Sequence, residues 1–265
     1  MKRSILIPTL CAGVGFAFMT GASRAATIVL NDTATYTNTG IKQTSRTVTL
    51  AQIDDGSDSD DFVLTGTDKL VVALKYEGEG SGRTVTSITY NGQAMTEAIF
   101  DLSNVASGGT NQALGIFYLD NPTGEGDLTI EFSGNTNGLG VSFWALSNTL
   151  AGGPAATSAA DGDGLSADIS VEAGNTFIAA AHVANNGAAT ALAPLTSTMT
   201  NSNVGSARGG SGYLNYDGAA DTIELDFDGG NSRPVTISAG FAVVPEPGSL
   251  ALVTVSSLCV LRRRR

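Results

Sequence analysis

The sequence predicts an all-β protein whose main part, residues 26–244, forms a single antiparallel, jelly-roll-like β-sandwich. Short runs of alternating apolar and polar residues recur throughout this region, with the two-residue period of a half-buried strand. Clusters of Gly, Asn, Asp and Pro separate these runs. No run in this region has the period of an amphipathic helix. Without a longer internal repeat, strands at this spacing indicate two packed antiparallel sheets.

In chain order, the expected strands are SRTVTLAQI, KLVVALKYE, RTVTSITY, QALGIFYL, DLTIEFSG, LGVSFWALS, TFIAAAHVAN, DTIELDFDG and PVTISAGFAVV. Asn91-Gly92 lies between two strand-like runs and is the strongest short-range signal for a hairpin. The segments LDNPTGEGD and FSGNTNG are expected to be turns because they concentrate turn-forming residues. Two tandem immunoglobulin-like domains that meet near residues 148–164 are the alternative architecture.

The charge distribution excludes one class of partner. Residues 27–245 contain seven basic and 24 acidic residues, which gives this region a net charge of −17. Such a surface repels phosphate backbones, so we expect no nucleic-acid partner. Both cysteines, Cys11 and Cys259, lie in the terminal apolar segments, so the sandwich is expected to fold without a disulfide.

The N-terminus has the three parts of a secretory signal peptide. The basic pair Lys2-Arg3 precedes an apolar stretch, and Ser23 and Ala25 occupy the small-residue positions of a cleavage site. We therefore expect removal of residues 1–25 by signal peptidase; a retained membrane anchor is the alternative.

The C-terminal segment, residues 245–265, contains a short apolar run followed by arginines. The 14 residues 248–261 would form a helix of about 21 Å, which is shorter than the ~30 Å hydrocarbon core of a bilayer. The terminal arginines would stay on the cytoplasmic side by the positive-inside rule. We expect a short apolar helix that halts translocation in the inner membrane only transiently.

This tail resembles the PEP-CTERM sorting signal of bacterial exported proteins. The matching residues are Pro245, Glu246 and Pro247, the apolar run, and Arg262, Arg263, Arg264 and Arg265. The resemblance implies that the partners are the export machinery and a membrane-embedded, exosortase-type enzyme that processes the chain near Pro-Glu-Pro. The order of strand-like segments from ITYNGQAMTEA to VSFWALSNT is similar to a broad group of bacterial exported β-sandwich domains, which implies a fold and no activity.

The middle region lacks recognisable catalytic motifs. His182 is the only histidine, no Gly-x-Ser-x-Gly sequence occurs, and no pair of carboxylates can be singled out as acid and base. A lone histidine in an apolar run is expected to be structural. We therefore expect a protein that is not an enzyme and has no catalytic residues.

Calcium is the one cofactor that the sequence suggests. Aspartates two residues apart beside glycine occur in DDGSDSDD, DGDG and DFDGGN, as oxygen-rich calcium loops require. None of these segments completes a twelve-residue calcium-binding loop, so solvated acidic loops are the alternative. The candidate ligands are Asp54, Asp58, Asp60, Asp226 and Asp228.

Two further features have competing interpretations. Trp144 could form a platform for a sugar ring, but core packing is the simpler interpretation of its place in an apolar strand. The alternating threonines Thr33, Thr35, Thr37 and Thr39 could bind ice, although threonine also favours strands in general.

Together these observations predict an exported protein of the cell envelope, cell surface or extracellular matrix. Its expected role is structural or adhesive, in association with extracellular polysaccharide. The alternatives are a secreted polysaccharide-active enzyme and a carbohydrate-binding or ice-binding module.

Overall fold

The protein is all-β, as the sequence predicts. The computed structural model describes residues 27–53, 62–80, 82–102, 111–161, 165–185, 187–229 and 234–244, which all belong to one compact unit. The expected signal peptide and sorting segment lie outside these residues. Within the described ranges, the only helix is the four-residue α1 (Leu50–Ile53), and no helix is long and apolar enough to cross a membrane.

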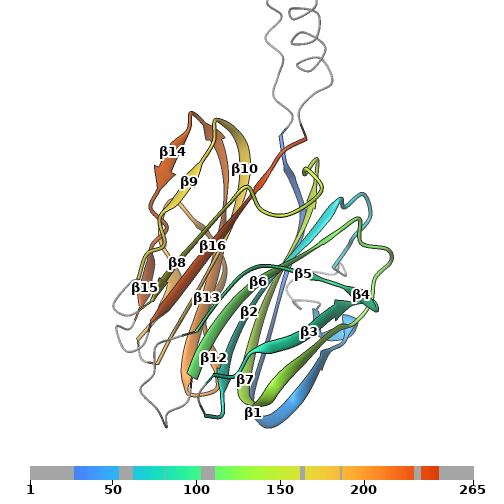
Figure 1. Ribbon diagram of the computed structural model, residues 1–265, viewed down its shortest axis with the longest axis vertical. Helices are drawn as coiled ribbons and strands as arrows, with labels where there is room; N and C mark the ends of the chain where they lie inside the picture. Colours follow the sequence, from blue (N-terminus) through green and yellow to red (C-terminus); the bar gives the residue numbers. More distant parts are fainter. Residues whose placement is uncertain are drawn as a thin grey trace, which may run out of the picture. The chain divides into compact units, whose positions relative to one another are not determined.

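The first half of the chain forms one sheet (Figure 1). Its strand order is β4-β3-β7-β2-β6-β5, and β1 pairs with β7 as well. All its pairings are antiparallel. The strands are β1 (Val29–Val48), β2 (Lys69–Gly78), β3 (Val85–Tyr90), β4 (Gln93–Ala94), β5 (Thr96–Leu102), β6 (Asn111–Asp120) and β7 (Leu128–Ser147).

The second half forms an antiparallel sheet of order β12-β13-β10-β16-β8, which faces the first sheet in Figure 1. Two small strand pairs, β14-β9 and β11-β15, accompany it. The strands are β8 (Ala156–Asp161), β9 (Ile169–Val171), β10 (Gly174–Ala184), β11 (Ala189–Ala191), β12 (Thr196–Val204), β13 (Ala207–Gly218), β14 (Asp221–Ile223), β15 (Phe227–Gly229) and β16 (Val235–Ala242).

The jelly-roll arrangement is not confirmed, because the chain completes one sheet before it begins the other. The change occurs between Ser147 and Ala156, inside the segment where the alternative of two tandem domains places its boundary. The two sheets nevertheless share a core, since β2 and β7 residues pack with β10 and β16 residues in one apolar cluster. The described residues therefore form one sandwich-like unit with a sheet from each half of the chain.

Two strands are longer than the sequence suggests. FSGNTNG was expected to be a turn, but it lies inside the 20-residue strand β7. The first part of β7 pairs with β3 and the second part with β2, while β1 follows β7 along its whole length. Within this Gly- and Asn-rich stretch, Thr136 and Gly138 pair with β1 on one side and β2 on the other, and the β1 register shifts on both sides of Gln43. In contrast, Leu50–Ile53, expected to continue a strand, forms α1.

The expected hairpin at Asn91-Gly92 is confirmed. Both residues have positive φ, 47° and 73°, and they connect β3 to β4 with Tyr90 opposite Gln93. This is the geometry that the Asn-Gly pair favours in a two-residue hairpin turn.

Three apolar clusters stabilise the fold. One lies on the side of the first sheet that faces away from the second sheet and includes Leu74, Tyr76 and Phe143. The second lies between the sheets and includes Val71, Trp144 and Phe177. The third covers the outer side of the second sheet under the small strand pairs. Because the first sheet has a core on each side, the strand β2 is buried on both faces.

Candidate functional site

Buried charged side chains of β2 face the second sheet. Alternate residues of a strand point to the same side, and Val71 and Ala73 belong to the cluster between the sheets. Lys69, Lys75 and Glu77 share this parity and are also buried. The layer between the sheets is therefore apolar near Val71 and becomes polar toward the end of β2.

Lys75 begins a chain of hydrogen bonds that crosses between the sheets. Its Nζ donates to Ser142 Oγ of β7 over 3.0 Å, and Ser142 Oγ lies 2.6 Å from Ser211 Oγ of β13. All three side chains are fully buried. Burial lowers the pKa of Lys75 to about 7, because the interior disfavours the charged ammonium.

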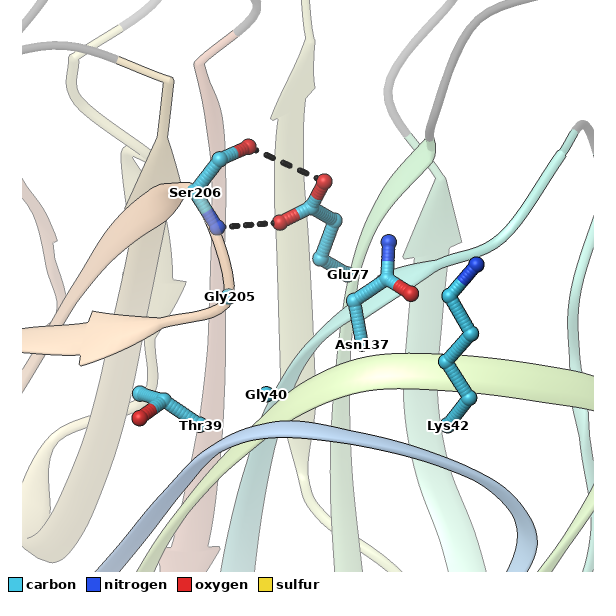
Figure 2. Close-up of a pocket in the computed structure, with 7 residues that line it drawn as sticks. All are labelled: Thr39, Gly40, Lys42, Glu77, Asn137, Gly205 and Ser206. Carbon is cyan, nitrogen blue, oxygen red and sulfur yellow. Dashed lines mark hydrogen bonds between the residues drawn. The ribbon is translucent and has the colours of Figure 1, made fainter.

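Glu77 holds the turn between β12 and β13 against the first sheet. Its carboxylate accepts hydrogen bonds from the backbone N–H of Ser206 and, over 3.0 Å, from Ser206 Oγ (Figure 2). Glu77 is only 2% exposed, so these bonds replace most of the hydration that its charge loses. We call the contact between Glu77 and the Gly205-Ser206 turn the latch.

Two glycines allow the latch to close. A Cβ on Gly138 of β7 would lie 2.0 Å from the backbone N of Gly205, and a Cβ on Gly205 would lie 2.2 Å from Glu77 Oε2. Gly205 also has a φ of +69°, a conformation that other residues adopt only with strain. The turn thus meets β7 at backbone-to-backbone distance, which only glycine permits.

A cavity of about 390 Å³ opens beside the latch. The residues that line it are Thr39, Gly40, Lys42, Glu77, Asn137, Gly205 and Ser206 (Figure 2). Asn137 Oδ1 is buried and accepts no hydrogen bond from the residues that the structure describes, and the ammonium group of Lys42 pairs with Glu79. Two exposed side chains of the lining can reach a ligand: the Thr39 hydroxyl can donate and accept hydrogen bonds, and the Lys42 ammonium can donate them, as a polyhydroxylated ligand requires.

His182 is a buried residue of β10. Its ring is fully buried and stacks on Phe227 with 5.3 Å between centroids, and Nδ1 lies 3.0 Å from Thr236 Oγ1. Burial lowers its pKa to about 4, so the imidazole is neutral at pH 7. None of its contacts reaches the latch residues.

Trp144 is a core residue, which confirms the simpler interpretation. It is fully buried between the sheets, packs edge-on against Phe177, and donates from Nε1 to Thr198 Oγ1 over 3.0 Å. It therefore offers no surface to a sugar ring. The threonines at 33, 35, 37 and 39 all lie on β1, where the first two are half-buried and the last two exposed.

The predicted calcium ligands are placed only in part. Asp54, Asp58 and Asp60 lie outside the described residues. Asp226 is half-buried beside β15, and Asp228 is exposed on it, with the buried Phe227 between them. Across the described ranges, no three His, Cys, Asp or Glu side chains gather in a metal-binding group.

Described residues at two of the acidic segments nevertheless pair with each other's neighbours. Ser166 pairs with Asp226, and Asp161 pairs with Val235. These two pairs join Asp161 and Ser166 to Val235 and Asp226, a relation that the sequence does not reveal.

The sequence predictions missed Lys75, Glu77 and Ser206. One signal for the first two is present: the run KLVVALKYE places its charges on the same parity as Val71 and Ala73. Alternation normally assigns such a face to solvent, and only the second sheet makes it an interior face.

Comparisons with known proteins place this chain in no group. No protein-family model, no curated protein and no solved structure matches it.

Proposed function

We propose that this chain is an exported protein that is sorted through its C-terminal tail and serves a structural or adhesive role outside the inner membrane. The observation that carries the proposal is the order Pro245-Glu246-Pro247, an apolar run, and Arg262 to Arg265 at the end of the chain. The localisation is the cell envelope, the cell surface or the extracellular matrix.

The arrangement of the polar residues supports a structural role over a catalytic one. Lys75, Glu77 and Ser206 all have partners that join the two sheets. Trp144 and His182 are packed in cores. The cavity beside the latch is the proposed contact with extracellular polysaccharide, because the exposed Thr39 hydroxyl and Lys42 ammonium on its lining suit sugar hydroxyl groups.

Replacement of Pro245, Glu246 and Pro247 by alanine tests the sorting proposal in a host that has an exosortase-type enzyme. The expected result is that the variant accumulates in the inner-membrane fraction while the unaltered protein leaves it. The variant keeps the apolar run and the arginines that halt its translocation, but it loses the motif at which it is processed. Ser256→Ala, in the apolar run, is the matched control and should behave as the unaltered protein. Normal release of the triple variant would contradict the proposal.

We also propose that calcium binds at the acidic segments, including Asp226 and Asp228. A flexible loop rich in oxygen atoms prefers calcium to the smaller magnesium ion. The region's net charge of −17 gives a bound divalent cation an additional stabilising effect.

Calcium is expected to raise the melting temperature in a saturable way. A ligand that binds only the folded state, present at 100 times its dissociation constant, stabilises by about 2.7 kcal/mol. That corresponds to several degrees, at ~2–4 °C per kcal/mol for a domain of this size. The rise should disappear in Asp226→Asn/Asp228→Asn or in Asp58→Asn/Asp60→Asn. If magnesium at the same ionic strength raised the melting temperature equally, the effect would be general screening of the acidic surface, and the calcium proposal would be wrong.

A further inference from the structure

Both ends of the sandwich leave it at the same place. Asn148 donates from Nδ2 to the carbonyl oxygen of Thr27 over 3.1 Å, and its own carbonyl accepts from Val244 N–H over 3.0 Å. Thr27 and Val244 are the first and last described residues. Figure 1 shows the start of β1 and the end of β16 side by side at this end of the two sheets.

Exposed apolar side chains gather around these two ends. Val29 is 47% exposed, Leu150 49% and Val244 43%. They are neighbours, because Val29 pairs with Ser147, Leu150 N–H bonds to the carbonyl of Ala242, and Val244 bonds to Asn148. We call these three side chains the apolar foot. Leu192, equally exposed at 42%, lies elsewhere, next to Asp226 on the outer side of the second sheet.

The chain on either side of the foot indicates what covers it. The sequence before residue 27 contains the apolar stretch of the signal peptide, and the apolar run 248–261 begins four residues after Val244. Four residues span at most about 14 Å when fully extended. If the run 248–261 enters a bilayer, the foot is therefore held within that distance of the membrane interface, where apolar side chains become buried to a depth of about 5–10 Å.

We infer that the apolar foot rests on the lipid surface of the inner membrane while the C-terminal segment is inserted. This inference rests on the proposed sorting function. The acidic sandwich and the Asp68 carboxylate, which accepts from Asn148 N–H, disfavour anionic headgroups. The surface that fits is a zwitterionic one. Contact through the foot would hold Pro245, one residue beyond Val244, at the depth where a membrane-embedded processing enzyme acts.

Quenching of tryptophan fluorescence by brominated lipid tests this contact. The full chain, carrying Leu150→Trp, is reconstituted into phosphatidylcholine vesicles with and without bromine-labelled acyl chains. Leu192→Trp is the matched control, because that site is similarly exposed and lies away from the foot. Trp144 is buried in both proteins and gives a constant background. We expect the added tryptophan at 150 to lose on the order of half its emission, and the one at 192 to lose none.

The outcomes separate this inference from the sorting proposal. If the chain floats with the vesicles but positions 150 and 192 are quenched equally, or neither is quenched, the foot does not contact lipid. An unquenched position 150 together with a dimer in size-exclusion chromatography would assign the foot to a second copy of the chain. If the chain does not float with the vesicles at all, the proposed membrane insertion fails, and this inference fails with it. Val244→Trp repeats the test at a second foot position.

Discussion

Gly138→Ala is expected to be the most damaging single-methyl substitution in the described part of the chain. The new Cβ would lie 2.0 Å from the backbone N of Gly205 and 2.6 Å from the backbone C of Val204. Because both are backbone atoms, no side chain can move aside, and the turn between β12 and β13 must separate from β7. We expect a loss of about 3 kcal/mol in the free energy of unfolding.

Thermal unfolding measures this effect, with an expected decrease in melting temperature of about 6–12 °C for a domain of this size. Gly153→Ala is the matched control. Its new Cβ would meet Tyr118 Oη at 3.5 Å, an ordinary contact, and its backbone has no positive φ. An unchanged melting temperature for Gly138→Ala would show that the latch does not hold the turn at backbone contact.

Lys75→Met is expected to have the largest stabilising effect. At pH 7 and below, the folded protein holds a charged ammonium in a fully buried site, which costs free energy that methionine avoids. Ser142 keeps Ser211 as a hydrogen-bond partner in the variant. We expect the free energy of unfolding at pH 7 to rise by roughly 2–4 kcal/mol.

The pH dependence gives this prediction a second readout. The pKa of Lys75 is about 7 in the folded protein and 10.5 for an unperturbed lysine. Above pH 7 the unfolded chain therefore binds more protons than the folded one, and stability rises with pH. Between pH 7 and 9 the rise is at most about 2–3 kcal/mol.

The variants locate the origin of this slope. Lys75→Met should lose it, whereas Lys42→Met, which removes an exposed side chain paired with Glu79, should keep it and change stability by less than about 1 kcal/mol. A slope that persists in Lys75→Met would place its origin at another group.

The sequence was informative where local rules act alone. Alternation predicted the all-β class, and Asn91-Gly92 predicted a hairpin because positive φ at two successive residues suits that pair. His182 and Trp144 were expected in the interior because they stand in apolar runs, and both are buried. Each of these inferences depends on neighbours within a few residues.

The features that the sequence did not predict depend on distant parts of the chain. FSGNTNG has the composition of a turn, but pairing of Thr136 and Gly138 with both β1 and β2 keeps it in β7. Lys75 and Glu77 have the alternation of a solvated face, but the second sheet, which begins about 80 residues later, covers them. The latch itself joins residues separated by 129 positions, Glu77 and Ser206, so no local pattern could predict it.

The function proposed for this chain depends most directly on whether its two ends are removed during export. Intact-mass measurement of the protein recovered from the envelope or the medium tests this in one step. The expected product lacks residues 1–25 and the arginine tail, and therefore begins at Ala26 and ends near Pro245-Glu246-Pro247. Recovery of the full 265-residue chain from the cytosol would contradict the account.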